Sequence, residues 1–490
     1  MMEKPVSISS PGRFVRRLSF AALRLRISER RMVLGIVDLF VVSGALWLAL
    51  ATQPDLAWHP ALTALYMRWF ATLWCIWLAS AFVFDLYDLP QAAYPRRAVQ
   101  NALSAGLMTV IIYALTPWLT PPLLSRLLLL VLAITALTGL GLWRLTYARF
   151  FTQPWSKQRL LIVGAGRAGA ELAQNLSQAS GVPSPYRSSG YELFGFVDND
   201  PALQKQIVAG APVQGDHTVL TSLVSALQID EVVVAITNRH AIRAELLEAL
   251  VACAEHGCRV TTMSALSERV LGRVPVLHVG HNLEEVFPIH EDIGMRLNAI
   301  FKRAIDLIVG LVGLVALGVV LPGVALANRL ASPGPLFYRQ VRVGRSGRCF
   351  TIYKLRSMAP EAEAATGAVW AAAGDSRVTP VGRWLRRTRL DELPQMINIL
   401  RGEMSLVGPR PERPEFVEQL ATKIPFYRAR HSVRPGVTGW AQVQYEYGRT
   451  IEDARIKLEY DLYYVRHASP LLDLQILFRT LAIAFQMKGS

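Results

Sequence analysis

Four apolar stretches in the first third of the chain constrain its fold more than any other feature. Each is close to the ~20 residues that a helix needs to cross a bilayer. They lie at about residues 32–51, 65–86, 98–118 and 123–145. Within lipid, only helices and closed barrels satisfy every backbone polar group. The sequence therefore predicts a bundle of four transmembrane helices over residues 32–147, preceded by a basic segment, residues 1–31.

The placement of charge predicts how this bundle lies in the membrane. Lysine and arginine are frequent before the first stretch, recur at Arg96 and Arg97 and follow the fourth stretch. The connections at residues 53–59 and 116–122 hold no lysine or arginine. Because positively charged loops stay in the cytoplasm, both ends of the bundle are expected there. Asp38, inside the first stretch, is expected to face the other helices rather than lipid.

Composition agrees with a membrane protein and narrows its ligands. Hydrophobic residues make up 52% of the 490-residue chain and charged residues only 18%, a balance that membrane spans explain. The net charge is +15, and its placement beside apolar segments favours anionic lipid or an anionic substrate over nucleic acid. The four cysteines lack paired spacing, so neither a disulfide framework nor a zinc site is expected.

Residues 157–290 predict a Rossmann-like parallel α/β domain, because short β runs alternate with helical patterns. The first run opens into Gly164-Ala-Gly166-Arg-Ala-Gly169, a glycine pattern that lets a pyrophosphate approach a helix N-terminus. Its acidic partner is expected at Asp198, which comes later than the ~20 residues that are typical. Two alternatives remain open: the domain binds NAD or another nucleotide, or it keeps the fold only for packing or dimer contacts.

A fifth apolar stretch, residues 305–326, carries Pro322 and has basic residues on both sides. Lys302 and Arg303 precede it, and several arginines follow it before any acidic residue occurs. Basic flanks favour cytoplasm at both ends, and a proline removes a helix hydrogen bond and bends the axis. We expect residues 296–328 to form a re-entrant membrane helix that breaks at Pro322. An ordinary span with a tolerated kink is the alternative.

The last unit, residues 329–490, holds the residues that point to chemistry. Asp391 and Glu392 precede a short helical pattern, and a helix N-terminus both keeps a carboxylate ionised and attracts phosphate. Arginines surround this acidic pair in the sequence: Arg383, Arg386, Arg387, Arg389 and, between two prolines, Arg410. Since arginine fits phosphate in a planar, bidentate manner, the pattern predicts a diphosphate site. Two adjacent carboxylates among phosphates also suit Mg²⁺, with Asp391 and Glu392 as its ligands.

Two further segments of this unit are expected to reach the substrate or the membrane. The turn at residues 434–439 offers backbone donors that suit a nucleotide head, so Arg434 and Thr438 are candidate binding residues; a structural turn is the alternative. Arg356, in the basic run that precedes the acidic pair, joins the candidate set. Apolar runs with single charges at residues 471–487 are typical of a helix that lies in the membrane interface.

Six motifs in a fixed order carry a resemblance to a known family. They are Lys302-Arg-Ala-Ile-Asp306, Lys354-Leu-Arg-Ser-Met358, Leu390-Asp-Glu-Leu-Pro-Gln395, Met404-Ser-Leu-Val-Gly-Pro-Arg-Pro411, Arg434-Pro-Gly-Val-Thr-Gly-Trp-Ala-Gln442 and Tyr460-Asp-Leu-Tyr-Tyr464. Residues 298–487 resemble the bacterial sugar transferase family, the monotopic phosphoglycosyl transferases. The preceding bundle and Rossmann-like unit resemble the long form of that family. One departure is Leu321, where many relatives carry a small polar residue before the helix-breaking proline.

The resemblance implies a reaction and gives roles to the matched residues. Asp391 would attack the sugar-proximal phosphorus of a UDP-sugar, releasing UMP and leaving an aspartyl-phosphosugar intermediate. Polyprenyl phosphate would then take up the phosphosugar. Glu392 would assist with Mg²⁺ or with proton traffic. Arg410 and Lys354 would hold phosphate oxygens, with Arg386 and Arg389 among the substrate-binding residues.

The resemblance also implies the substrates and the setting. The donor would be UDP-glucose, or else UDP-galactose or another UDP-sugar, and the acceptor undecaprenyl phosphate. The step would be the first membrane step of exopolysaccharide, capsule or O-antigen synthesis, catalysed on the cytoplasmic side of the bacterial inner membrane. Membrane lipids, downstream glycosyltransferases and a second copy of the chain are the expected partners.

Two functions of other classes compete with this interpretation. An NAD-dependent nucleotide-sugar dehydratase or epimerase would use a tyrosine with a lysine four residues later, and none of the 15 tyrosines has one. A non-catalytic membrane scaffold would leave the acidic pair and its arginines unexplained. The expected fold class is therefore a membrane protein of mixed α and α/β structure, in which a transmembrane bundle precedes a Rossmann-like domain and a helix-anchored α/β domain.

Overall fold

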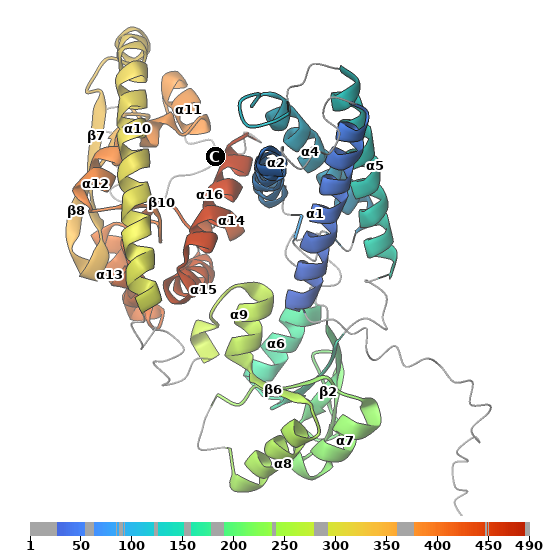
Figure 1. Cartoon of the computed structure of the whole chain (residues 1–490). Coiled ribbons are helices and arrows are strands. Elements are labelled where there is room, and N and C mark those ends of the chain that lie inside the picture. Colours follow the sequence, from blue (N-terminus) through green and yellow to red (C-terminus); the bar gives the residue numbers. More distant parts are fainter. Residues whose placement is uncertain are drawn as a thin grey trace, which may run out of the picture.

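The computed structural model describes residues 27–53, 63–84, 86–87, 92, 94–121, 126–150, 158–177, 191–237, 242–278, 293–359, 377–445, 448 and 450–485. Most of the basic N-terminal segment and most of the first connection of the bundle lie outside these residues. The described chain forms a helical bundle, a Rossmann-like unit and a C-terminal unit with the long helix α10 along its side (Figure 1).

The bundle consists of α1 (Ile27–Ala51), α2 (Thr63–Val83), α4 (Pro95–Ala114) and α5 (Arg126–Phe150). Within the described residues, four helices are long and apolar enough to cross a membrane, and these are α1, α2, α5 and α10. The third predicted span, α4, is not among them. Its first turns carry the polar residues Arg96, Arg97, Gln100 and Asn101, which lower its mean hydropathy. It buries small residues such as Ala102, Ala105 and Gly106, which let neighbouring helices approach closely.

Asp38 faces the other helices, as expected from its place in the first stretch. It forms an ion pair with Arg144 of α5, and both side chains are at most 1% exposed. Arg144 also donates to the carbonyl of Leu86 at 3.1 Å. Because an unpaired buried charge is strongly destabilising, this pair fixes α1 against α5.

The second unit confirms the predicted Rossmann-like α/β fold. Its sheet has the order β3-β4-β2-β1-β5-β6, parallel except for the β3–β4 hairpin. The strands are β1 (Gln158–Val163), β2 (Tyr191–Val197), β3 (Ile207–Val208), β4 (Ala211–Gly215), β5 (Glu231–Val234) and β6 (Arg259–Thr262). The helices are α6 (Arg167–Ser177), α7 (Leu220–Leu227), α8 (Ala244–Glu255) and α9 (Met263–Leu271), with short 3₁₀ turns η6 (His217–Val219) and η8 (Val276–His278). Buried apolar clusters form with α6 and α9 on one face and with α7 and α8 on the other.

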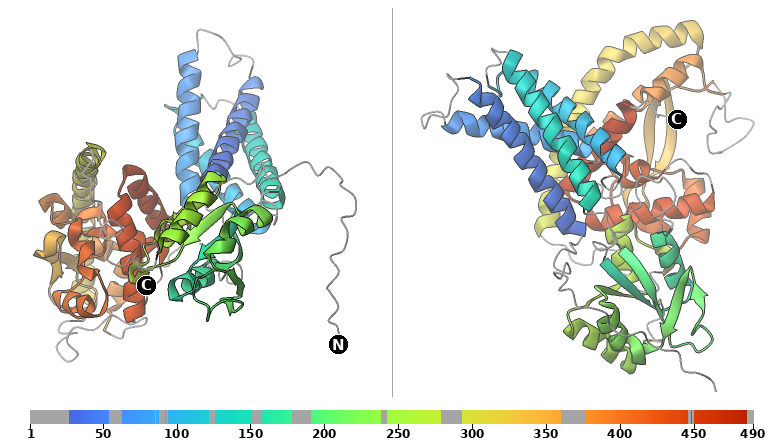
Figure 2. Two further views of the ribbon diagram at one scale, coloured as in Figure 1. Left: turned by 90° about the horizontal axis from the view of Figure 1, so that it is seen from below. Right: turned by 90° about the vertical axis from the view of Figure 1, so that its right-hand side faces the viewer.

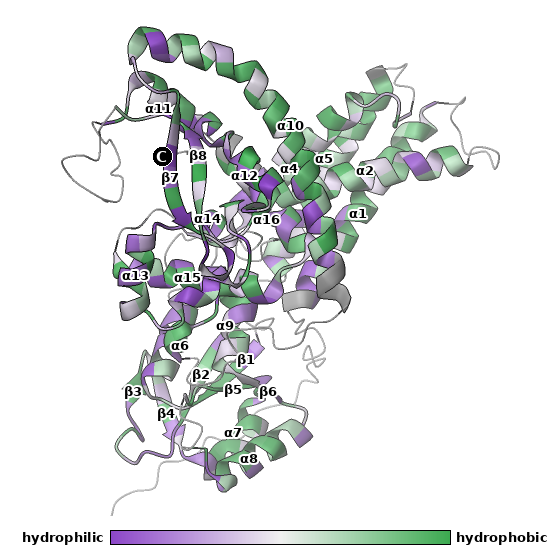
Figure 3. Ribbon diagram, turned by 90° about the vertical axis from the view of Figure 1, so that its left-hand side faces the viewer, coloured by the Kyte–Doolittle hydropathy of each residue, from purple (hydrophilic) through white to green (hydrophobic). Residues whose placement is uncertain are grey.

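Helix α10 (Ile293–Ala331) corrects one detail of the expected re-entrant helix. It continues through Pro322 without a break in helical structure, and its axis curves in the views of Figures 2 and 3. A proline removes one backbone hydrogen bond and bends a helix that neighbouring turns still hold together. One face of α10 is apolar and exposed: Ile308, Leu311, Val312, Val315 and Val319 are each at least 60% exposed.

In its described residues, the C-terminal unit combines two small sheets with six helices. The strands β7 (Phe337–Val343) and β8 (Cys349–Leu355) pair antiparallel, and β9 (Ser405–Val407) and β10 (Gly436–Thr438) pair parallel. The helices are α11 (Pro380–Arg387), α12 (Gln395–Arg401), α13 (Pro414–Lys423), α14 (Trp440–Gln444), α15 (Ile451–His467) and α16 (Pro470–Phe485). The 3₁₀ turns are η10 (Arg345–Gly347), η11 (Leu390–Glu392) and η12 (Tyr427–Ser432). Helix α16 also packs on α2 of the bundle.

Polar contacts fasten the first part of α10 to this unit. Lys302 Nζ donates to Asp473 Oδ2 at 2.8 Å and to the Tyr464 hydroxyl at 3.0 Å. Asp306 Oδ1 accepts from the Ser405 hydroxyl at 3.0 Å and from the Leu406 backbone N–H at 2.9 Å. The first and last motifs of the resemblance therefore meet in space, and they hold the apolar helix against the rest of the unit.

Candidate active site

Asp391 and Glu392 lie in the 3₁₀ turn η11, immediately before α12. The turn begins after Arg389, whose φ of +55° is in the left-handed region that only glycine adopts without strain. The short helix that follows ends at Gly402 in the left-handed conformation, with φ +81°. The acidic pair is thus set by a strained residue on one side and a helix N-terminus on the other.

Apolar packing anchors this acidic turn against the middle of α10. Leu390 and Leu393, which flank the two acids, belong to the same cluster as Leu317 and Val324 of α10. The α10 residues of this cluster lie on both sides of Pro322, so the bent part of the helix supports the turn directly. Leu321, which departs from the family pattern, is partly buried in the same cluster.

Three cations surround the carboxylate of Glu392. Its Oε1 lies 2.9 Å from Lys354 Nζ and 3.5 Å from Arg410 Nη2, and its Oε2 lies 3.8 Å from Arg389 Nη1. Burial by itself would raise the pKa of Glu392, but the charges of Lys354, Arg410 and Arg389 outweigh it and hold the pKa at about 2. Glu392 is therefore an anion over the whole physiological range.

Asp391 has a different environment although it is the next residue. It is 7% exposed, and none of the described residues donates a hydrogen bond to it. Burial and the neighbouring Glu392 carboxylate raise its pKa to about 6, while Lys354, Arg386 and Arg410 moderate the rise. At neutral pH it is ionised, and its lone pairs are available to an electrophile rather than engaged by hydrogen bonds.

The arginines beside the pair are themselves held in place. Arg386 Nε donates to the Ser357 hydroxyl at 2.9 Å. The backbone carbonyl of Arg410 accepts from Arg430 Nη2 at 3.1 Å, and Arg430 forms a buried ion pair with Asp461 at 2.6 Å. Because the supporting groups are buried and paired, the guanidinium of Arg410 is presented to the acidic pair from a rigid base.

A cavity of about 170 Å³ opens beside the acidic turn and connects it with the second candidate segment. Its walls are Arg389, Glu392, Leu393, Met396, Val437, Thr438 and Thr480. The hydroxyls of Thr438 and Thr480 lie 2.6 Å apart and form a hydrogen bond. The structure therefore brings the predicted residue Thr438 to the site, together with Thr480 of α16, for which the sequence carried no signal.

Arg356 and Arg434 do not join this group, in contrast to the expectation from the sequence. Arg356 is 5% exposed, and its guanidinium donates to the carbonyls of Pro335 and Ser332 and to the Ser332 hydroxyl, just after α10 ends. The charged neighbours of Arg434 are Arg303, Arg345 and Asp306, and burial lowers its pKa. Arg356 thus holds in place the segment that follows α10, instead of facing the acidic turn.

The acidic pair also fits the expected Mg²⁺ ion in its donor chemistry. Within the described residues, no group of three or more His, Cys, Asp or Glu side chains is arranged to hold a metal. Mg²⁺ needs no such group when it binds through one or two carboxylates together with substrate phosphates. Asp391 accepts no hydrogen bond from the described residues, and Glu392 Oε2 is buried without one, so both acids retain oxygen lone pairs.

Comparison with known proteins now identifies the family. The profile of the bacterial sugar transferase family matches residues 297–487, and that of a CoA-binding domain matches residues 82–263. The exopolysaccharide production protein PSS of Rhizobium leguminosarum is 38% identical to this chain. The matched region covers 94% of that protein and 38% of this chain. The chain belongs to the bacterial sugar transferase family.

Two larger relatives of this sugar transferase carry more specific names. The UDP-N-acetylgalactosamine-undecaprenyl-phosphate N-acetylgalactosaminephosphotransferase of Aeromonas hydrophila is 37% identical over 60% of this chain and 67% of its own length. The UDP-glucose:undecaprenyl-phosphate glucose-1-phosphate transferase of Escherichia coli (strain K12) is 39% identical, and the match spans only about half of its length, 52%. A solved Rex-family repressor is 15% identical over 27% of this chain with a TM-score of 0.19, a similarity that supports no inference.

The glycine loop of the transferase's Rossmann-like unit has the backbone that its sequence predicted. Gly164 has φ +106°, and a Cβ on Gly169 would lie 2.0 Å from the Gly164 carbonyl oxygen, so neither tolerates a side chain. A Cβ on Gly166 would meet nothing within 4 Å, which leaves room for a ligand. Asp198, however, turns into the loop. Its Oδ2 accepts from the Ala165 N–H at 2.6 Å and its Oδ1 from the Asp200 N–H at 2.9 Å.

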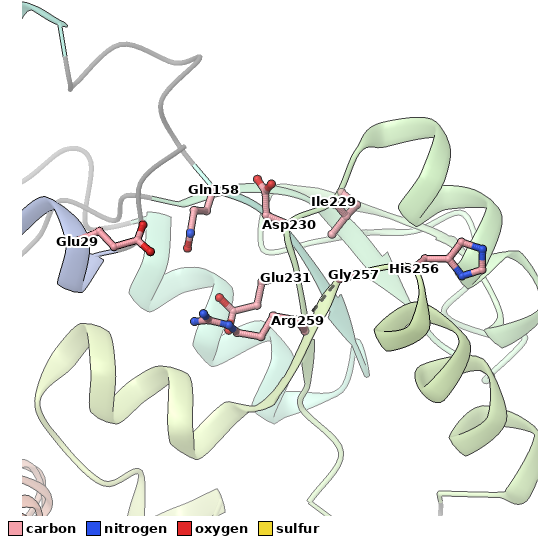
Figure 4. Close-up of a pocket in the computed structure, with 9 residues that line it drawn as sticks. Glu29, Gln158, Ile229, Asp230, Glu231, His256, Gly257 and Arg259 are labelled. Carbon is pink, nitrogen blue, oxygen red and sulfur yellow. Dashed lines mark hydrogen bonds between the residues drawn. The ribbon is translucent and has the colours of Figure 1, made fainter. Parts of the chain in front are cut away.

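A larger cavity, about 320 Å³, lies at the opposite edge of the same sheet (Figure 4). Gln158, Glu231 and Arg259, which begin β1, β5 and β6, contribute to its walls. The carboxylate of Glu231 already accepts from the hydroxyls of Tyr191 and Thr261 and from Arg269. Although this cavity is the larger of the two, its size does not make it the reactive site, because the buried Glu231 already has partners inside the protein.

Proposed function

We propose that this protein transfers a sugar 1-phosphate from a UDP-sugar to undecaprenyl phosphate, with Asp391 as the nucleophile. The observation that carries the proposal is the contrast within the acidic pair. Asp391 is buried, ionised at neutral pH and free of hydrogen bonds from the described residues, while Glu392 beside it is fixed by Lys354, Arg410 and Arg389. A carboxylate among cations that also attract a diphosphate suits displacement at phosphorus.

In the first half of the reaction, a carboxylate oxygen of Asp391 forms a bond to the sugar-proximal phosphorus. The bond from that phosphorus to the bridging oxygen breaks, and UMP leaves with the bridging oxygen. Arg410 and Lys354 offset the charge that develops on the phosphoryl oxygens and on the leaving phosphate, because both cations lie at the acidic pair. The product on the enzyme is an acyl phosphate that carries the sugar.

In the second half, a phosphate oxygen of undecaprenyl phosphate attacks the same phosphorus, and the Asp391 carboxylate is released unchanged. The product is a lipid-linked diphosphate sugar. A Mg²⁺ ion bound to Asp391 and Glu392 would neutralise phosphate charge and so admit two anionic substrates to one site. Glu392 suits this role because its pKa is held at about 2, so that its carboxylate stays negatively charged.

For the donor we propose UDP-glucose, as the resemblance implies, and UDP-N-acetylgalactosamine is the competitor that the name of the Aeromonas relative suggests. The decisive test is a panel of UDP-sugars assayed for UMP release with undecaprenyl phosphate present. We expect one donor to be preferred and the release to depend on the lipid after the first turnover. Absence of UMP release with every donor would refute the proposed reaction.

We further propose that the active site lies at the cytoplasmic face of the inner membrane, at headgroup depth. The support is the packing of α10: its polar contacts and its apolar cluster attach both its first part and the region around Pro322 to the C-terminal unit. Its exposed face carries the large apolar residues that suit lipid. Because α10 is attached along its length to the C-terminal unit, we expect it to enter one leaflet of the membrane together with that unit and not to cross the membrane.

Cysteine labelling tests this location in a variant whose four native cysteines are replaced. Ala299→Cys and Ser346→Cys place single thiols at exposed positions near the start of α10 and in the turn after β7. Both are expected to react only with reagents that reach the cytoplasm. Labelling of Ser346→Cys by a membrane-impermeant reagent from the periplasm would show that α10 is an ordinary span.

A further inference from the structure

The Rossmann-like unit contacts the C-terminal unit through α9 and the residues that follow it, which lie against α15 (Figures 1 and 3). Glu268 pairs with Arg466 and with His467, the latter at 2.7 Å. Arg273 lies 3.5 Å from the Glu459 carboxylate, and the Val274 N–H donates to the Glu459 carbonyl at 3.0 Å. These charged and backbone contacts define one docking surface between the two units.

Trp440 is the aromatic residue at this docking surface. Its indole N–H donates to the carbonyl of Gly272 at 2.8 Å, and its side chain is 6% exposed in the folded chain. Its ring stacks on Tyr463 with 5.8 Å between ring centroids, and the guanidinium of Arg479 lies 5.3 Å from the Trp440 ring. A buried indole N–H requires an acceptor, and here a different unit of the chain provides it.

The same residue is connected to the wall of the cavity beside Glu392. Trp440 follows Thr438 and Gly439 in the chain, so its position constrains the end of β10. Arg479, which lies over its ring, precedes Thr480, and Thr480 bonds to Thr438. Both routes lead from the Gly272 carbonyl to Thr438, which lines the cavity.

We propose that Trp440 is a positioning residue, through which the Rossmann-like unit sets the cavity wall formed by Thr438 and Thr480. The inference rests on the proposed function, because it takes the cavity beside Glu392 as the place where a substrate of that reaction binds. When the units are docked, the indole is fixed and the threonine pair has one arrangement. When the Gly272 carbonyl is withdrawn or displaced, β10 and α14 lose a support and the substrate meets a looser wall.

Trp440→Phe tests the link from the C-terminal side in the full-length enzyme. Phenylalanine keeps an aromatic ring for Tyr463 and Arg479 but cannot donate to Gly272. The KM for the UDP-sugar or for undecaprenyl phosphate is expected to rise about fivefold, the effect of losing one net hydrogen bond. The value of kcat should stay within about twofold, since Trp440 touches neither Asp391 nor its cations.

Gly272→Asn tests the same link from the Rossmann-like side without changing the C-terminal unit. Asparagine tolerates the left-handed backbone of this position, φ +62°, but its Cβ would lie 3.3 Å from the Trp440 ring and displace it. Gly210→Asn is the matched control, because Gly210 has φ +85° and its Cβ would meet nothing within 4 Å. The rise in KM is expected for Gly272→Asn and not for Gly210→Asn.

Two further measurements make the outcome decisive. The double variant of Trp440 and Gly272 should show no larger effect than the stronger single variant, because both disturb one contact. Amide exchange at residues 436–445 should be faster in both single variants and unchanged in Gly210→Asn. If the wild-type enzyme transferred no phosphosugar, the proposed function would be wrong. The amide exchange measurement would then still decide whether the Rossmann-like unit acts on residues 436–445. Unchanged exchange, or KM values equal to those of the control, would overturn the inference.

Discussion

Asp198 in the Rossmann-like unit and Asp391 in the C-terminal unit can be compared, because Asp198 contacts the loop that leads into α6 and Asp391 lies in the turn that leads into α12. Both carboxylate oxygens of Asp198 accept backbone N–H groups, from Ala165 at 2.6 Å and from Asp200 at 2.9 Å. Asp391 accepts no hydrogen bond within the described chain, and the charges that act on it are those of Glu392, Lys354, Arg386 and Arg410. A hydrogen bond engages each oxygen of the first carboxylate, whereas the second carboxylate accepts none from the described residues.

The difference shows how one residue type can make a loop rigid or make a site reactive. Backbone N–H donors stabilise the carboxylate and fix the loop, and they leave it little capacity to bind another group. Cations at longer range favour ionisation without occupying the lone pairs. This contrast supports the proposal of a structural role for Asp198 and the nucleophilic role for Asp391, and four experiments can break or sharpen it.

The largest effect is expected from a matched pair, Asp391→Asn and Asp198→Asn. Asparagine has the size of aspartate but no nucleophilic carboxylate, so Asp391→Asn should reduce UMP release to below about 1% of wild type. Asp198→Asn should keep activity within about twofold and lose about 1 kcal/mol of stability. Substantial release by folded Asp391→Asn protein, confirmed by its circular dichroism, would remove Asp391 from its role.

The next comparison separates two arginines that the sequence placed in one candidate set. Arg410→Lys should lower kcat/KM about tenfold, because lysine cannot reproduce a planar, bidentate contact with phosphate. Arg356→Lys should leave the kinetics of the folded enzyme unchanged but cost about 2 kcal/mol of stability, since several carbonyl partners lose their donor. Thermal unfolding and kinetics measured on both variants check this, and a reversed pattern would contradict the assignment.

The third prediction concerns pH. Since the pKa of Asp391 is raised to about 6, the carboxylate takes up a proton as the pH falls through that value, and the protonated form is not a nucleophile. The rate is therefore full well above pH 6, falls to about half where the pH equals that pKa and declines further below it. Glu392→Gln removes one cause of the raised pKa, so the acid limb of kcat/KM should move to lower pH, whatever the maximum rate. An unmoved limb would show that another group controls it.

The smallest effect on transfer is expected in the glycine loop. Gly166→Ala adds a methyl group into open space, where it would obstruct a bound pyrophosphate but not the fold. If the unit carries out no step of the reaction, UMP release should stay within about twofold of wild type. Gly169→Ala is the contrasting variant, because its Cβ would lie 2.0 Å from the Gly164 carbonyl and must destabilise the unit. Loss of activity in folded Gly166→Ala protein, restored by added dinucleotide, would give the loop a functional ligand.

Much of the fold and part of the site followed from local sequence patterns. Apolar stretches predicted the helices of the bundle, because a helix closes its backbone hydrogen bonds within one segment and the thickness of the bilayer sets the length that it needs. The glycine pattern predicted the loop after β1, in which Gly164 has φ +106°. Asp391, Glu392 and Arg410 were recognisable because the turn and its arginines are nearby in the chain or fixed by prolines. The expected break at Pro322 was wrong, since tertiary packing on both sides of the proline holds one continuous helix.

What the sequence determined by itself was the identity of the acidic pair, the class of fold and the family motifs, since each depends on residues close together in the chain. Only the tertiary structure decided which partners each charge has. It brought Arg356 to the segment after α10 and Asp198 to the glycine loop, and it brought Thr480 to Thr438 and Gly272 to Trp440. The physical reason is that a hydrogen bond or an ion pair depends on atoms within a few ångströms of each other, and contacts between distant segments leave no periodic pattern in sequence.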